Sequence, residues 1–181
     1  MERQRDKDGR VIFTEEMRKE FTILAPVMSP IHFGIIEKVF TNHGYNLKML
    51  YTTNKEIVDT GLQNVHNDTC YPALLVVGQL LEAINSGEYD KSKLAVMITQ
   101  TGGGCRASNY IHLLRRALKK NGLDYIPVIS LNATGMEKNP GFKLNLQFLA
   151  ELMYAVIYGD ALMLLSHQTR PYEVHKGDTD A

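Results

Sequence analysis

One segment of the chain passes from a continuous apolar run through three consecutive glycines to a helical pattern, and it constrains the fold most strongly. The apolar run covers 94–99 (LAVMIT), the glycines are Gly102, Gly103 and Gly104, and the helical pattern starts near Tyr110. An uninterrupted apolar run of this length is typical of a strand in a parallel sheet that is covered on both faces. The glycines lack a Cβ, so the backbone there can take positive φ and come close to a bound group. The segment therefore predicts a buried parallel strand with a ligand-facing turn at its carboxyl end.

Strand and helix patterns alternate along the rest of the chain. We expect strands at 21–27, 45–51, 94–99 and 126–131, and helices at 31–40, 54–61, 72–84 and 110–120. The second strand alternates apolar and polar side chains, as a half-exposed edge strand does. Repeated strand–helix alternation requires parallel strands joined by right-handed crossovers. The sequence predicts an α/β three-layer sandwich with a parallel sheet of about four strands, flavodoxin-like or Rossmann-like, plus a long C-terminal helix.

The composition changes twice along the chain, which suggests three regions. Residues 1–20 begin with a polar, charged stretch (MERQRDKDGR) and are expected to be a mobile or linker segment. Residues 21–140 carry the strand–helix alternation and are expected to form the α/β domain. Residues 141–181 are expected to be a C-terminal helical segment that begins the next module of a larger protein.

The C-terminal segment contains a long apolar stretch at 145–167 (NLQFLAELMYAVIYGDALMLLSH). Its length approaches that of a membrane span, but Gln147, Glu151, Gly159 and Asp160 interrupt it. We therefore expect a buried or interface helix and no membrane association.

Charge and cysteine content limit the partners of the chain. Its 181 residues contain 20 Lys and Arg against 20 Asp and Glu, so no net charge draws it to nucleic acid or to anionic membranes. We expect no nucleic-acid partner. The two cysteines, without a signal-like N-terminus, favour a reducing, cytoplasmic location over a disulfide scaffold.

The two cysteines, Cys70 and Cys105, each lie where a loop turns into a helix N-terminus. Near Cys70, Asp68 or Thr69 is a suitable N-cap and Pro72 suits the first helical turn. Helix N-termini favour anions and lower the pKa of cysteine, and the thiolate is the form that ligates metals. The alternative is that both cysteines are small buried apolar residues. Their matching positions favour a pair that serves one site.

Ligands of open parallel sheets bind beyond the carboxyl ends of the strands, where the strand order reverses. Ser29 and His32 follow the first strand and Asn132 follows the fourth, so we expect them to bind a cofactor together with Gly102–Gly104. We expect His32 to be a hydrogen-bonded turn residue rather than a catalytic base. The pattern identifies no catalytic residue.

Three segments resemble one protein family: NDTCYPALLVVGQ, TQTGGGCRASNY and PVISLNATGMEKNPGFK. They are similar to the large proteins related to the 2-hydroxyacyl-CoA dehydratases and their ATP-dependent activases. The resemblance extends from the SPIHF turn at Ser29 to the GDALM and RPYE segments. Members of this family combine actin-like ATPase modules with dehydratase-like modules that carry iron–sulfur clusters, and this chain resembles part of the latter.

The resemblance implies that Cys70 and Cys105 ligate an iron–sulfur cluster, most often of the [4Fe–4S] type. Such clusters usually have four thiolate ligands, so the chain supplies an incomplete set. The rest would come from another segment or domain, from water or substrate, or from a homodimer mate. The implied role is ATP-coupled low-potential electron transfer, or dehydration of acyl-CoA-type substrates, by a fragment that is not catalytic alone.

Three alternatives remain open. The Gly102–Gly104 turn could bind the phosphate of a nucleotide or of CoA, although the chain has neither a G-x-G-x-x-G fingerprint nor the lysine of a P-loop. The two cysteines could bind zinc with His66 and His112, but His112 is two helical turns, about 10 Å, beyond Cys105. The chain could also be a structural or interaction domain.

Overall fold

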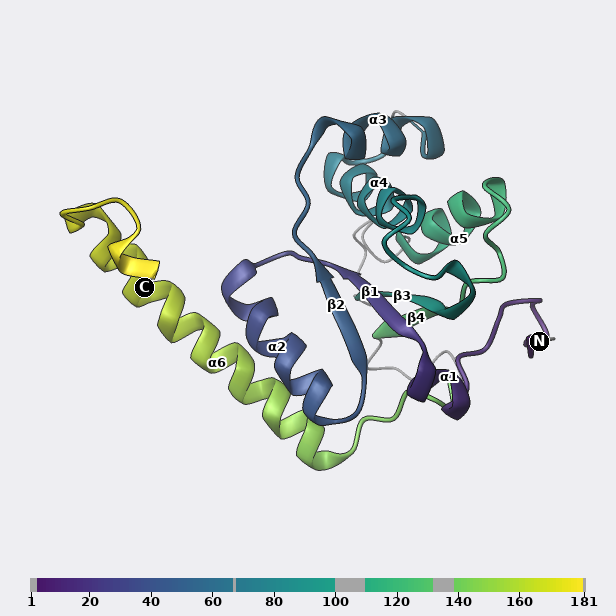
Figure 1. Cartoon of the computed structure of the whole chain (residues 1–181), viewed down its shortest axis with the longest axis horizontal. Coiled ribbons are helices and arrows are strands. Elements are labelled where there is room, and N and C mark those ends of the chain that lie inside the picture. The colour runs from purple at the N-terminus through teal and green to yellow at the C-terminus, as the bar shows by residue number, and fades with distance from the viewer. Residues whose placement is uncertain (1–2, 67, 100–109, 132–138, 181) are drawn as a thin grey trace.

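The computed structural model describes residues 3–66, 68–99, 110–131 and 139–180. Its sheet contains β1 (Thr22–Pro26), β2 (Asn46–Leu50), β3 (Leu94–Thr99) and β4 (Val128–Leu131). All pairs are parallel, in the order β2-β1-β3-β4 (Figure 1). This order matches the first four strands of flavodoxin-like sheets rather than the Rossmann order. The predicted α/β architecture with a four-stranded parallel sheet is confirmed.

Helices cover both faces of the sheet (Figure 1). On one face lie α4 (Tyr71–Asn85) and α5 (Tyr110–Lys120), with α3 (Lys55–Asn64) packed against α4. On the other face lie α2 (Pro30–Asn42) and α6 (Leu146–Thr169), together with the short α1 (Glu15–Glu20). Three short 3₁₀ turns complete the described elements: η1 (Lys91–Lys93), η3 (Arg170–Tyr172) and η4 (Asp178–Asp180).

The central strands bury both of their faces, which explains the continuous apolar run of β3. Val96 points into the cluster beneath α4 and α5, whereas Ala95 and Met97 point into the cluster beneath α2 and α6. β2 is an edge strand, and the predicted alternation holds from Asn46 to Met49, where Leu47 is buried and Lys48 is exposed. It fails at the end of the strand, because Leu50 is buried and Tyr51 is exposed.

The segment that precedes β1 contributes to the same core. Val11, Phe13 and Met17 are buried in the cluster beneath α2 and α6. Thr14 caps α1, since its hydroxyl accepts a hydrogen bond from the Met17 amide. Residues 11–20, which the sequence assigns to a linker, therefore pack against the α/β domain in the structure.

Helices α3 and α4 approach closely through two glycines. A Cβ on Gly61 would lie 2.5 Å from the Leu74 carbonyl oxygen, and one on Gly78 would lie 2.0 Å from the Ile57 oxygen. The sequence pattern predicts that Gly61 ends the helix, and this is wrong because α3 continues to Asn64. Gly61 is needed for the helix contact and not for a change of backbone direction.

Helix α6 runs antiparallel to α2. Near its start, Phe148 stacks on His43 and Glu151 accepts a hydrogen bond from that histidine at 3.0 Å, just after α2 ends. Near its middle, Asp160 lies 3.0 Å from His32 in the first turn of α2. From Asp160 to Thr169 the helix continues about 14 Å past this contact, at 1.5 Å per residue. The last turns of α6 therefore project from the body of the molecule (Figure 1).

Candidate functional site: a crevice at the carboxyl edge of the sheet

An apolar cavity of about 400 Å³ lies at the carboxyl ends of β1 and β3. Among the described residues that line it, Thr99 and Tyr110 carry hydroxyls and the other side chains are apolar. The elements that contribute lining residues are β1 (Ala25, Pro26), α2 (Phe33, Ile36, Phe40), β2 (Leu47, Met49), β3 (Met97, Ile98, Thr99), α4 (Val76), α5 (Tyr110) and α6 (Leu152, Val156).

The strand order explains why the cavity forms there. The chain leaves β1 toward the edge strand β2 and then crosses back to β3 on the other side of β1. The two connections therefore cover opposite faces of the sheet, and a crevice opens between the carboxyl ends of β1 and β3. The three glycines, Gly102–Gly104, follow Thr99 after two intervening residues in the sequence.

Cys70 is exposed at the N-terminus of α4, as predicted. Its own carbonyl accepts hydrogen bonds from the first turn, including one from the Leu74 amide at 3.3 Å, so Cys70 itself is the N-cap. The prediction that Asp68 or Thr69 caps this helix is therefore wrong. The Cys70 side chain makes no cap hydrogen bond, and its Sγ instead lies 3.0 Å from the Tyr110 hydroxyl.

Tyr110 joins the two parts of the candidate site. It is the first residue of α5, it lines the apolar cavity, and its hydroxyl contacts the thiol of Cys70. The sequence predicted that a helix starts near Tyr110, but no pattern signalled the contact with Cys70. The predicted site residues Gly102, Gly103, Gly104, Cys105 and Asn132 lie outside the described residues. The pairing of Cys70 with Cys105 stays a prediction.

Ser29 is the N-cap of α2, His32 lies in the first turn of this helix, and the two side chains are hydrogen-bonded to each other. The Ser29 Oγ is 2.7 Å from Nδ1 of His32, and Nε2 of the same ring is 3.0 Å from Oδ1 of Asp160. A carboxylate only accepts hydrogen bonds, so in the neutral imidazole Nε2 carries the proton and Nδ1 accepts from the Ser29 hydroxyl. His32 is hydrogen-bonded through both ring nitrogens, as expected, and its role in cofactor binding stays a prediction.

The contact between His32 and Asp160 depends on Gly159. A Cβ on Gly159 would lie 2.3 Å from Cδ2 of His32, so only glycine lets α6 cross the ring this closely. Asp160 completes a Ser–His–Asp chain of hydrogen bonds. In the sequence, Asp160 was noticeable only because the Gly159-Asp160 pair interrupts an apolar helix. The ring itself does not line the cavity, but its neighbour Phe33 does.

In the described part of the chain, no group of three or more His, Cys, Asp or Glu side chains could hold a metal ion. His66, a candidate zinc ligand, lies 3.3 Å from the Asp68 carboxylate. Tyr51 directly follows β2. Partial desolvation raises the pKa of the Tyr51 hydroxyl, and the nearby Glu37 carboxylate raises it further.

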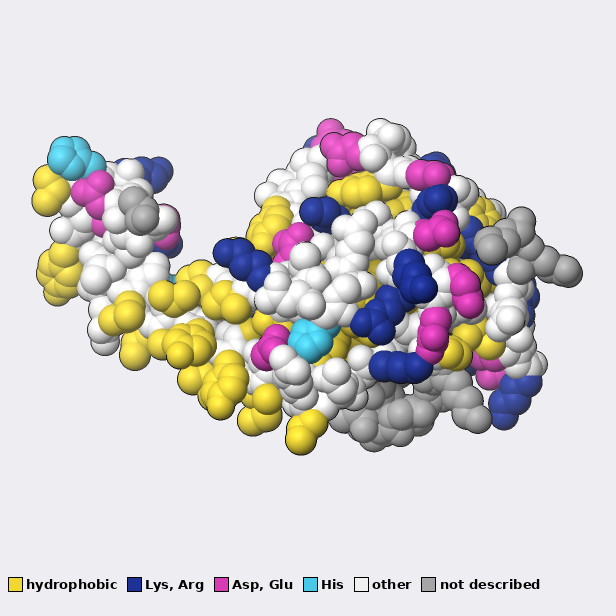
Figure 2. Space-filling model, turned by 60° about the horizontal axis from the view of Figure 1, so that its bottom comes forward, with side chains coloured by type: hydrophobic (Ala, Val, Ile, Leu, Met, Phe, Trp, Pro, Cys, Tyr) yellow, Lys and Arg dark blue, Asp and Glu magenta, His cyan; other side chains and the backbone are white. Residues whose placement is uncertain are grey.

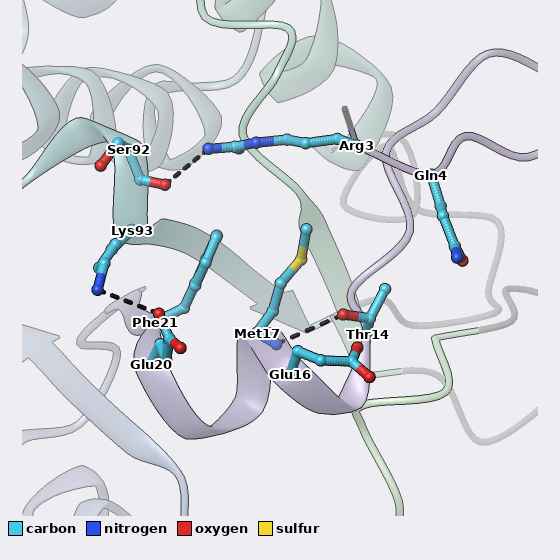
Figure 3. Close-up of a pocket in the computed structure, with 9 residues that line it drawn as sticks. All are labelled: Arg3, Gln4, Thr14, Glu16, Met17, Glu20, Phe21, Ser92 and Lys93. Atoms are coloured by element: carbon cyan, nitrogen blue, oxygen red, sulfur yellow. Dashed lines mark hydrogen bonds and ion pairs between the residues drawn. The ribbon is translucent and has the colours of Figure 1, made fainter. Parts of the chain in front are cut away.

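A second cavity, of about 570 Å³, lies at the opposite edge, near the amino ends of β1 and β3 (Figure 3). Several of its polar groups pair with one another: Lys93 pairs with Glu20 at 3.1 Å, and Arg3 donates to the Ser92 carbonyl at 2.7 Å. Desolvation is the main cause of the lowered pKa of Arg3. Because ligands of such sheets bind at the carboxyl edge, the apolar crevice is the better candidate site.

The segment Leu146–Tyr172, which contains α6, is long and apolar enough to cross a membrane, with a mean hydropathy of 1.6. Only 17% of its most apolar window is buried in the molecule. Length and composition alone are weak evidence for a membrane span, because core helices of soluble proteins share both.

Comparison of the chain with protein-family models, curated proteins and solved structures gave no match. The fold and the contacts around Cys70 therefore carry the functional argument.

Proposed function

We propose that the chain is an iron–sulfur cluster-binding, dehydratase-like module in which Cys70 and Cys105 are cluster ligands. The observation that carries this proposal is the contact of the Cys70 thiol with Tyr110, 3.0 Å from sulfur to oxygen. Tyr110 follows Cys105 by five residues, and five residues span at most about 18 Å when fully extended. This span allows the two cysteines to ligate one cluster.

The position of Cys70 suits a cluster ligand. Its side chain is exposed and lies at the N-terminus of a 15-residue helix, where the helix dipole stabilises a thiolate. Cluster ligation needs thiolates, and two cysteines leave coordination positions for other donors. Those donors come from another domain or from a second copy, so the module works as part of a larger assembly in the cytoplasm.

The apolar crevice suits the acyl part of a substrate. Tyr110 both lines it and contacts Cys70, so a cluster held by the cysteines adjoins the cavity. A lining with two hydroxyls and otherwise apolar side chains favours a hydrocarbon chain over a charged phosphate group. This is consistent with low-potential reduction or dehydration of acyl-CoA-type substrates.

Anaerobic reconstitution with iron and sulfide tests the proposal. The wild-type chain should gain visible absorption and bound iron after desalting, and Cys70→Ser and Cys105→Ser should each lose most of both, because a serine hydroxyl is a much poorer ligand than a thiolate. Melting temperatures of the variants provide the control for folding. Equal iron content in the wild type and both variants would end the cluster proposal. If Gly103→Val abolishes CoA binding while both cysteine variants still bind CoA, the phosphate-site alternative is correct instead.

A further inference from the structure

Helix α6 carries ten of the seventeen large apolar side chains that are exposed in the described part of the chain. Its ten exposed large apolar side chains are between 46% and 84% exposed, and they follow the projecting helix (Figure 2). Side chains of this size, about half exposed, together offer on the order of 1,000 Å². An exposed apolar area of this size is comparable with the roughly 800 Å² per partner that a stable complex buries. A helix that is apolar on all sides needs a further partner in solution.

The face of α6 that points away from the body carries a regular row of apolar residues. Phe148, Ala155 and Gly159 are the buried residues of the helix. At about 100° per residue, the opposite face carries a row that we call the outer seam. The outer seam consists of Leu146, Ala150, Met153, Ile157, Ala161 and Leu164, all of them exposed. Spacings of three and four residues, as in this row, are typical of a helix that packs against another helix.

The order of sizes along the outer seam is the same in both directions: large, small, large, large, small, large. In an antiparallel pair of α6 helices centred near residue 155, Leu146 faces Leu164 of the other copy, and Met153 faces Ile157. The two alanines then face each other and let the helix backbones come close. A two-fold interface requires this kind of self-complementarity, because the same surface is used by both partners.

Charge does not oppose the association of two copies. The only Asp and Glu side chains of α6 are Glu151 and Asp160, and each is hydrogen-bonded to a histidine of its own chain. The outer seam itself carries no charged residue, and the whole chain has a formal net charge of zero. Self-repulsion between copies is therefore small.

From the outer seam we infer that the chain forms a two-fold symmetric homodimer through antiparallel packing of its α6 helices. The inference does not depend on cluster binding. A dimer through α6 can form whether or not Cys70 ligates iron. An experiment that refutes cluster binding therefore does not refute the dimer, and the reverse also holds.

Sedimentation equilibrium of the full chain at about 1–100 µM tests the dimer. The wild type should sediment as a dimer, and Ile157→Glu should raise the dissociation constant at least about 100-fold, because the symmetric interface loses the contact twice. Leu62→Glu is the matched control, since Leu62 is 51% exposed on α3, far from the outer seam in the sequence, and its replacement should leave the dimer intact. A monomeric or polymeric wild type, or equal effects of the two variants, would overturn the inference.

Disulfide trapping tests the antiparallel direction, even if Ile157→Glu fails to fold. In chains with Cys70→Ser and Cys105→Ser, Leu146→Cys and Leu164→Cys are introduced separately. Oxidation of a mixture should give crosslinked dimers, whereas each variant alone should not crosslink. Self-crosslinking of Leu146→Cys would indicate a parallel pair and contradict the inference. So would flotation of a monomeric chain with phosphatidylcholine vesicles, which would show that α6 is covered by lipid instead.

Discussion

Replacement of Gly159 by alanine tests the close crossing of α6 over α2. The added Cβ would lie 2.3 Å from Cδ2 and 2.7 Å from Cγ of His32. Carbon atoms in contact are normally about 3.5–4.0 Å apart, so the ring or the helix must move by more than about 1 Å. The ring cannot simply rotate away, because both of its nitrogens are hydrogen-bonded, one to Ser29 and one to Asp160.

Three effects set the size of the change in stability. Overpacking of this kind costs about 1–3 kcal/mol. Loss of the hydrogen bond between His32 and the largely exposed Asp160 adds about 1 kcal/mol. Alanine is better than glycine in a helix by about 1 kcal/mol, which offsets part of the loss. The net destabilisation is about 2 kcal/mol, and for a chain of this size the melting temperature should fall by about 4–8 °C.

Thermal and urea unfolding of Gly159→Ala, compared with Gly34→Ala, measure this effect. Gly34 lies inside α2, and a Cβ there would meet only the Tyr51 hydroxyl at 3.8 Å, an ordinary contact. Gly34→Ala should therefore raise the free energy of unfolding by about 0.5–1 kcal/mol. If Gly159→Ala is as stable as the wild type, or is stabilised like Gly34→Ala, the reasoning about the helix crossing is refuted.

Three further predictions concern the packing and the pH dependence. Gly78→Ala should lower the free energy of unfolding in urea by about 1–3 kcal/mol, because the new Cβ would lie 2.0 Å from a backbone oxygen of α3; an unchanged midpoint would contradict it. Phe148→Ala, in a fully buried aromatic cluster, should cost about 3–5 kcal/mol by the same assay, and a loss below about 1 kcal/mol would argue against the docking of α6. Hydrogen bonds from Gln147 and then His43 lower the pKa of Glu151, so its contribution to stability is present above the ordinary carboxyl pKa and is lost as the pH falls through the lowered value. Glu151→Gln should therefore weaken the fall of melting temperature below about pH 5, and an unaltered acid dependence would disprove this role.

Local patterns in the sequence were enough to predict the main elements of the fold. Side chains of a strand point alternately to its two sides. The continuous apolar run of β3 therefore indicates burial on both faces, and the alternation in β2 indicates burial on one face. The position of Cys70 at a helix start was also predictable, because Pro72 marks the first turn. These features depend on neighbouring residues, so tertiary contacts are not needed to infer them.

Tertiary structure alone decided which distant groups meet. The strand order, which opens the crevice between β1 and β3, depends on how the crossover connections pack and has no local signal. Asp160 is 128 residues from His32 in the sequence, and their hydrogen bond exists because Gly159 lets two helices cross closely. Cys70 and Tyr110 meet because α4 and α5 both begin at the carboxyl edge. The sequence determined which residues could take part in a site, whereas the packing of helices on the sheet decided which of them lie together, because such contacts depend on the relative placement of whole elements.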